Sequence, residues 1–156
     1  TDYEMYQWRF NLATGKTREG VVDDILNTEF PVINGWYQGY RNRYSYNVLM
    51  GRMRTLEQPH FAGIAKYDLL SGSATAYHPG PGYWFSEATF ARKDRAVDED
   101  DGYVVGFVFN TRENRSEVWV FDAKQIADGP VAKVILPQRV PNGFHATWVG
   151  ADRLRA

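Results

Sequence analysis

Cysteine is absent from this sequence, and histidine is scarce, with three histidines among 156 residues. Without cysteine the chain has no disulfide framework, no thiolate metal site and no cysteine nucleophile. Any bound metal must therefore be held by histidine, aspartate or glutamate. The N-terminal stretch lacks the charged, apolar and small-residue segments of a signal peptide. Together with the missing cysteines, this predicts a cytoplasmic protein.

An excess of one charge and a long apolar run are also missing. The 18 basic and 19 acidic residues are mixed along the chain and give a net charge of -1, so a nucleic-acid partner is not expected. No apolar run approaches the roughly 20 residues that cross a bilayer, so no transmembrane segment is predicted. The hydrophobic share of 44% is enough to build a buried core.

Long helical periodicity is hard to find, whereas short runs rich in aromatic and β-branched residues recur between turn-forming residues. Such runs are typical of β-strands. The clearest of them cover residues 43–52, 61–70, 102–110 and 116–123. The sequence therefore predicts a nearly all-β chain.

Three hairpin turns repeat at a constant interval. They contain Thr14-Gly15, Ser71-Gly72 and Asp128-Gly129, and their glycines are 57 residues apart (72 minus 15, and 129 minus 72). This interval is in the range of β-propeller blades. Propellers need about four to eight blades, and the chain supplies fewer than three. We therefore predict that residues 1–156 are the C-terminal segment of one propeller domain, with two to three blades.

A polar residue recurs in the strand expected after each hairpin. Glu29, Glu87 and His145 are 58 residues apart (87 minus 29, and 145 minus 87), and "EATF" from Glu87 aligns with "HATW" from His145. The first strand of each propeller blade lines the central axis, so these side chains should converge. His145 is then either a hydrogen-bonded core histidine or a metal ligand. The shared register favours the ligand, with a glutamate accepting the proton of its other ring nitrogen.

Two other histidines and one acidic run need separate interpretations. His60 and His78 lie beside prolines, outside the register of the three axial residues, so neither is expected to be a ligand. The acidic run "DEDDG", Asp98 to Gly102, lacks the oxygen spacing of an EF-hand loop. We expect it to be a solvated hairpin tip.

Four motifs, in this order and spacing, resemble the carotenoid cleavage oxygenases, the family of the lignostilbene dioxygenases and the retinal pigment epithelium isomerase. They are "EFPVINGWYQGYRNRYSY", "YWFSEATFARKD", "EDDGYVVGFVFN" and "LPQRVPNGFHATWV". The resemblance implies a seven-bladed β-propeller with Fe(II) on its axis, held by four histidines and supported by three glutamates. It covers the C-terminal third of the family fold, so this chain would hold an incomplete propeller.

The resemblance also assigns roles to the three axial residues. His145 matches the last iron-binding histidine, and Glu29 and Glu87 match two of the glutamates that orient such histidines. Glu87 should orient His145, and Glu29 a histidine outside this chain. The implied activity is O₂-dependent cleavage of a stilbene-like or apocarotenoid double bond into two carbonyl products, with the N-terminal remainder of the propeller as a partner. The segment by itself should be inactive. The alternatives are a non-catalytic propeller or interaction module, and an isomerase of the same fold.

Overall fold

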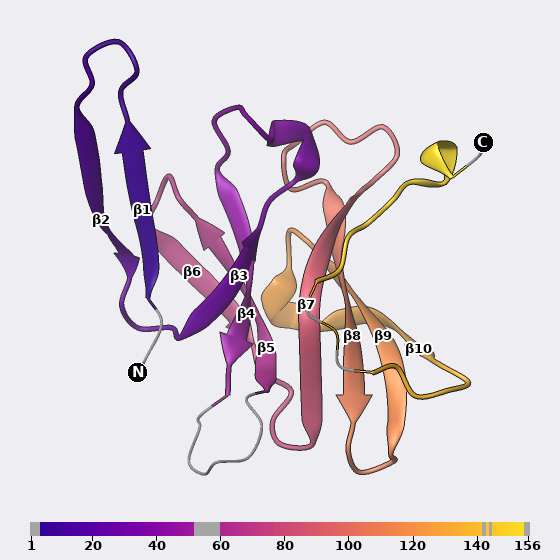
Figure 1. Cartoon of the computed structure of the whole chain (residues 1–156). Coiled ribbons are helices and arrows are strands. Elements are labelled where there is room, and N and C mark those ends of the chain that lie inside the picture. The colour runs from indigo at the N-terminus through magenta and orange to yellow at the C-terminus, as the bar shows by residue number, and fades with distance from the viewer. Residues whose placement is uncertain (1–3, 52–59, 142, 144, 155–156) are drawn as a thin grey trace.

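β-Strands make up most of the regular structure. The computed structural model describes residues 4–51, 60–141, 143 and 145–154, and these ranges contain ten strands and three short 3-10 helices (Figure 1). In the strand at 102–110, buried residues alternate with more exposed ones, because successive side chains of a strand point to opposite faces. No helix in these ranges is long and apolar enough to cross a membrane. The prediction of a nearly all-β chain is confirmed.

The strands follow one another as a hairpin and two antiparallel meanders. They are β1 (Met5–Phe10), β2 (Thr17–Asp23), β3 (Thr28–Val32), β4 (Tyr44–Met50), β5 (Phe61–Asp68), β6 (Ser73–Tyr77), β7 (Tyr83–Arg92), β8 (Gly102–Asn110), β9 (Arg115–Asp122) and β10 (Pro130–Ile135). The 3-10 helices are η1 (Gly35–Tyr37), η2 (Ile126–Asp128) and η3 (Ala151–Arg153).

The two meanders have the same internal order. In the first meander β3, β4, β5 and β6 pair in sequence, and in the second meander β7, β8, β9 and β10 do the same. A single register pair, Phe61 with Phe85, joins them into one eight-stranded sheet. β1 and β2 form a separate two-stranded sheet. The boundaries 1–156 for a segment of one propeller domain stay a prediction.

The three repeated glycines all have a positive φ, which glycine adopts without penalty. Gly15, Gly72 and Gly129 have φ angles of +69°, +68° and +89°. They lie between β1 and β2, between β5 and β6, and directly before β10. The N–H groups of Gly15 and Gly72 donate to carbonyls four residues earlier, those of Asn11 and Asp68, whereas Gly129 follows η2 and donates to Ile126. The 57-residue interval therefore corresponds to a repeated turn at the first two glycines and to a positive φ at all three.

One apolar core packs the two meanders against each other. Tyr46 and Ile64 of the first meander meet Phe85, Trp119 and Phe121 of the second, and all five are buried. Burial of such large side chains contributes about 1.5–3 kcal/mol each. A smaller cluster joins the β1–β2 hairpin to β4 and β5 and includes Met5, Val22, Leu49, Ala65 and Tyr67. The core therefore fixes β3 and β7, the first strands of the two meanders, relative to each other.

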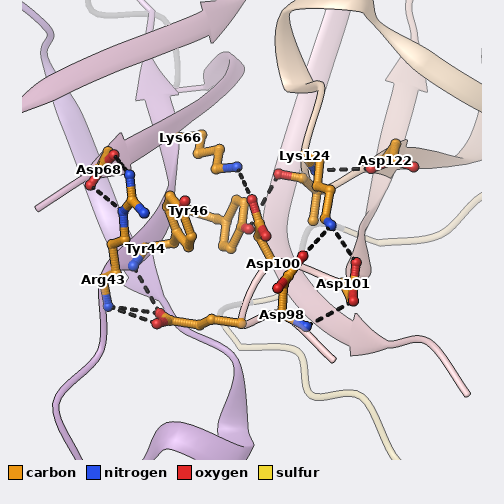
Figure 2. Close-up of polar contacts among 12 residues, drawn as sticks. Arg43, Tyr44, Tyr46, Lys66, Asp68, Asp98, Asp100, Asp101, Asp122 and Lys124 are labelled. Carbon is orange, nitrogen blue, oxygen red and sulfur yellow. Dashed lines mark hydrogen bonds and ion pairs between the residues drawn. The ribbon is translucent and has the colours of Figure 1, made fainter. Parts of the chain in front are cut away.

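The acidic run between β7 and β8 differs from the prediction of a solvated tip. The Glu99 carboxylate accepts hydrogen bonds at 2.8 Å from the backbone N–H groups of Arg43 and Tyr44. Asp100 is buried, and its Oδ2 lies 2.7 Å from Nζ of Lys66 (Figure 2). These partners all belong to the first meander, so the sequence around the run could not reveal them. The run forms a polar bridge between the meanders.

Candidate metal centre

Glu87 lies at an irregularity in the first strand of the second meander. The register between β7 and β8 shifts between Phe85 and Ala88, so Ser86 and Glu87 face Phe107. The Ser86 Oγ accepts a hydrogen bond from the Phe107 N–H at 3.1 Å, which replaces a missing bond of the ladder. Such β-bulges re-aim a side chain and are common beside active sites. Only 9% of the Glu87 side chain is exposed.

His145 contacts Glu87 directly. Its Nδ1 lies 2.7 Å from Oε1 of Glu87, and the Ala146 N–H donates to Oε2 at 3.1 Å. Figure 1 shows how this is possible, since the C-terminal segment runs past β7. Both carboxylate oxygens therefore bind the segment that carries His145.

This contact selects the tautomer of the imidazole. A carboxylate can only accept hydrogen bonds, so Nδ1 of His145 carries a proton and its N–H donates a hydrogen bond to Glu87. The lone pair of the neutral ring is then on Nε2. A carboxylate on one ring nitrogen is the usual support of a metal-binding histidine, and it raises the basicity of the other nitrogen. The pair therefore fits a metal site in which Nε2 of His145 is one ligand and Glu87 supports it.

The surroundings of the pair are open and largely apolar. The His145 side chain is 78% exposed in this chain. Beside it lies a hollow of about 120 Å³ whose walls include Trp84, Phe107, Val140 and Pro141. The segment before His145 is held to β9, because the Val140 N–H donates to Oγ of Ser116 at 2.9 Å.

Glu29 occupies a matching place in the first meander. It lies in β3, where the register with β4 shifts between Glu29 and Val32, so this glutamate also borders a bulge. Its side chain is half-buried. None of the described residues gives it a hydrogen bond or an ion pair. The structure thus brings Glu87 and His145 together and leaves Glu29 without a polar partner in the described part of the chain.

The expected further strand at "GFHATW" is wrong. Residues 143 and 145–150 have no regular secondary structure. A strand exists only where backbone groups pair with a neighbour. Here the Ala146 N–H donates to a side chain instead. The position of His145 beside β7 therefore depends on Glu87 and not on a sheet ladder.

The remaining histidines do not complete a metal site. His60 stacks on the Trp84 ring, with a centroid distance of 5.4 Å, and His78 is exposed after β6. Across the described ranges no three histidine or carboxylate side chains gather as metal ligands. The assignment of His145 as one of the four expected metal-binding imidazoles therefore stays a prediction.

Phe30 is a neighbour of His145 that the sequence analysis missed. The two ring centroids are 5.9 Å apart at an angle of 71°, an edge-to-face contact. Phe30 has a φ of 52°, which is unusual for a bulky residue. One sequence signal was available: Pro31 interrupts a strand, and proline within strands is confined to edges and bulges.

Comparison with known proteins identifies the family. The family model for the retinal pigment epithelial membrane protein matches residues 1–150. The carotenoid 9,10(9',10')-cleavage dioxygenase of Crocus sativus is 35% identical over 97% of this chain and 30% of its own length. The lignostilbene-alpha,beta-dioxygenase isozyme III of Sphingomonas paucimobilis is 26% identical over 96% of this chain and 32% of its own.

The fold agrees with solved structures of the same group. The cobalt-substituted Synechocystis apocarotenoid oxygenase superposes with a TM-score of 0.81 at 24% identity, over 94% of this chain and 30% of that one. The predicted fold class, part of a β-propeller, is confirmed. The chain spans about 30% of the length of curated relatives such as the Crocus sativus enzyme. By its sequence and fold, this chain belongs to the retinal pigment epithelial membrane protein family, the family of the carotenoid cleavage oxygenases.

Proposed function

We propose that this chain is the C-terminal part of a non-haem Fe(II) dioxygenase that cleaves a carbon–carbon double bond, and that His145 is one of its iron ligands. The observation that carries the proposal is the 2.7 Å contact between Nδ1 of His145 and Oε1 of Glu87. The two residues are 58 positions apart, the same interval that separates Glu29 from Glu87. A buried carboxylate that fixes the tautomer of an otherwise exposed imidazole has a clear use beside a metal.

The names of the relatives support a proposal for the substrate class. Their names describe cleavage of carotenoids and of lignostilbene, both of which contain conjugated double bonds. We propose a stilbene-like or apocarotenoid alkene as the substrate of this protein, with O₂ as the second reactant. Both oxygen atoms would enter the products, one in each new carbonyl group. The cell compartment that we propose is the cytoplasm.

The chain's own residues prepare the site for iron. Glu87 holds the proton on Nδ1 of His145 and leaves Nε2 for the metal. Neutral imidazoles suit Fe(II), and the bound ion would supply the positive centre at which O₂ reacts. Glu29 has no polar partner among the described residues. We assign it the same task as Glu87, toward an imidazole from the N-terminal remainder of the propeller.

Two measurements test this function. Elemental analysis of the complete protein should give about one iron per polypeptide, and ¹⁸O₂ should label both carbonyl products. A protein without iron and without turnover would be a non-catalytic propeller. Turnover without ¹⁸O in either product would indicate an isomerase of the same fold. Either result contradicts the dioxygenase proposal.

Replacing Glu87 by glutamine should weaken the site without destroying it. The carboxylate accepts from both Nδ1 of His145 and the N–H of Ala146. A glutamine has one acceptor oxygen, so one of these two bonds is lost. Loss of such a partner typically lowers metal affinity or activity about 10- to 100-fold. Iron titration and steady-state kinetics of Glu87→Gln measure the effect.

The matched control is Glu113→Gln, which makes the same chemical change at an exposed position. Iron affinity of this control should equal that of the wild type. Wild-type affinity and turnover in Glu87→Gln would refute the role assigned to Glu87.

A further inference from the structure

The imidazole of His145 has two direct supports in the described structure. Glu87 binds its Nδ1, and the ring of Phe30 meets it edge to face with centroids 5.9 Å apart. The rest of the side chain is open, since 78% of it is exposed. The two supports come from different meanders, because Phe30 lies in β3 and Glu87 in β7.

The two supports restrain different motions. A single hydrogen bond fixes one ring atom, but the ring can still rock about the line from Nδ1 to Oε1. The contact with Phe30, at an interplanar angle of 71°, opposes this rocking. Phe30 is itself held, because its ring packs edge to face on Phe61 with centroids 5.5 Å apart. The position of the Phe30 ring is therefore set by a residue of the first meander and does not depend on His145.

The backbone of Phe30 is strained at this point. Its φ of 52° lies in the left-handed region, which costs a bulky residue energy unless the surroundings enforce it. The strain coincides with the bulge between Glu29 and Val32. Such strained positions cluster at functional sites. A glycine here would avoid the strain but would remove the ring beside His145.

We propose that Phe30 is a positioning residue that holds the plane of the His145 imidazole, so that Nε2 points in one direction. This inference rests on the proposed function, in which Nε2 binds iron. The first meander then acts on the metal centre twice, through the Glu29 carboxylate and through the Phe30 ring. The bulge in β3 lies between Glu29 and Val32, and the Phe30 ring beside His145 comes from it.

The test uses the complete protein, metal-free, with ¹³C-labelled histidine. In Phe30→Leu the NMR order parameter of the His145 Cε1–H bond should fall from about 0.85 to below about 0.6. Iron should then leave the loaded variant about two- to tenfold faster in the presence of a chelator, the range that one aromatic pair contributes. Phe30→Tyr keeps the ring and should restore both values.

Phe107→Leu is the matched control, since this ring lines the hollow beside His145 but makes no ring contact with it among the described residues. It should leave the order parameter unchanged. If Phe30→Leu does not fold, Phe30→Gly, which suits the left-handed backbone, serves in its place. An unchanged order parameter in a folded variant overturns the inference. A wild-type protein that binds no iron overturns the proposed function, whatever the order parameter of the His145 ring is.

Discussion

His145→Ala is expected to abolish stoichiometric iron binding by the complete protein, and with it double-bond cleavage. Structural zinc sites with four ligands gain about 10–16 kcal/mol from the metal, and on that scale one ligand in four corresponds to about 3 kcal/mol or more. This lowers the affinity on the order of 100-fold. Elemental analysis after dialysis against a chelator measures the loss, and product formation from the alkene measures its consequence.

Two further variants separate ligation from folding. His145→Gln keeps an amide that can donate to Glu87, but it provides no imidazole, so it should also lose iron while its unfolding free energy stays near the wild-type value. His78→Ala removes an exposed histidine and should bind iron normally. Full iron occupancy in purified, folded His145→Ala would refute the assignment of His145.

Repetition in the sequence predicted that Glu29, Glu87 and His145 converge, and the family resemblance paired Glu87 with His145. The 58-residue interval placed Glu87 and His145 in one register, and the structure has them 2.7 Å apart. This was possible because a repeated supersecondary unit puts equivalent residues in equivalent places. The same reasoning failed for the strand at "GFHATW", because strand formation also requires a hydrogen-bonding neighbour, and none of the described residues pairs with 145–150.

Contacts between segments far apart in the chain were not visible in the sequence. The contact of Phe30 with His145 depends on a bulge and a positive φ, which arise from packing and not from local propensity. The ion pair of Lys66 with Asp100 joins residues on different meanders. Neither pair shares a periodic register, so no pattern along the chain could predict them. Such contacts fix the positions of Phe30, Glu87 and His145 relative to one another.

The loop that forms the polar bridge is held by contacts within the second meander. Asp101 lies 2.6 Å from Nζ of Lys124 and accepts from the backbone N–H groups of Val97 and Asp98 (Figure 2). The hydrogen bond from Lys124, followed by the two backbone bonds, holds the pKa of Asp101 well below its usual range. Contacts within the second meander therefore hold the loop from which Glu99 and Asp100 reach their partners.

Asp100→Ala is expected to lower the free energy of unfolding by about 3–5 kcal/mol, because it leaves the Lys66 ammonium buried without its counter-charge. The rings of Tyr44 and Tyr46, 4.2 and 5.9 Å from Nζ of Lys66, compensate part of that loss. Urea denaturation at pH 7 measures the change. The double variant Lys66→Met, Asp100→Leu should recover most of it, since apolar replacement of a buried pair is often neutral.

Asp98→Ala is the matched control for this experiment, because it removes a carboxylate from the same loop. Asp98 also pairs with a lysine, Lys124, but 63% of its side chain is exposed. Exposed pairs contribute little, so the stability of this variant should stay close to that of the wild type. If Asp100→Ala were no more destabilising than Asp98→Ala, the bridge would not hold the meanders together. The relative placement of Glu29 and Glu87 would then rest on the apolar core, the Phe61–Phe85 pair and the hydrogen bonds of Glu99.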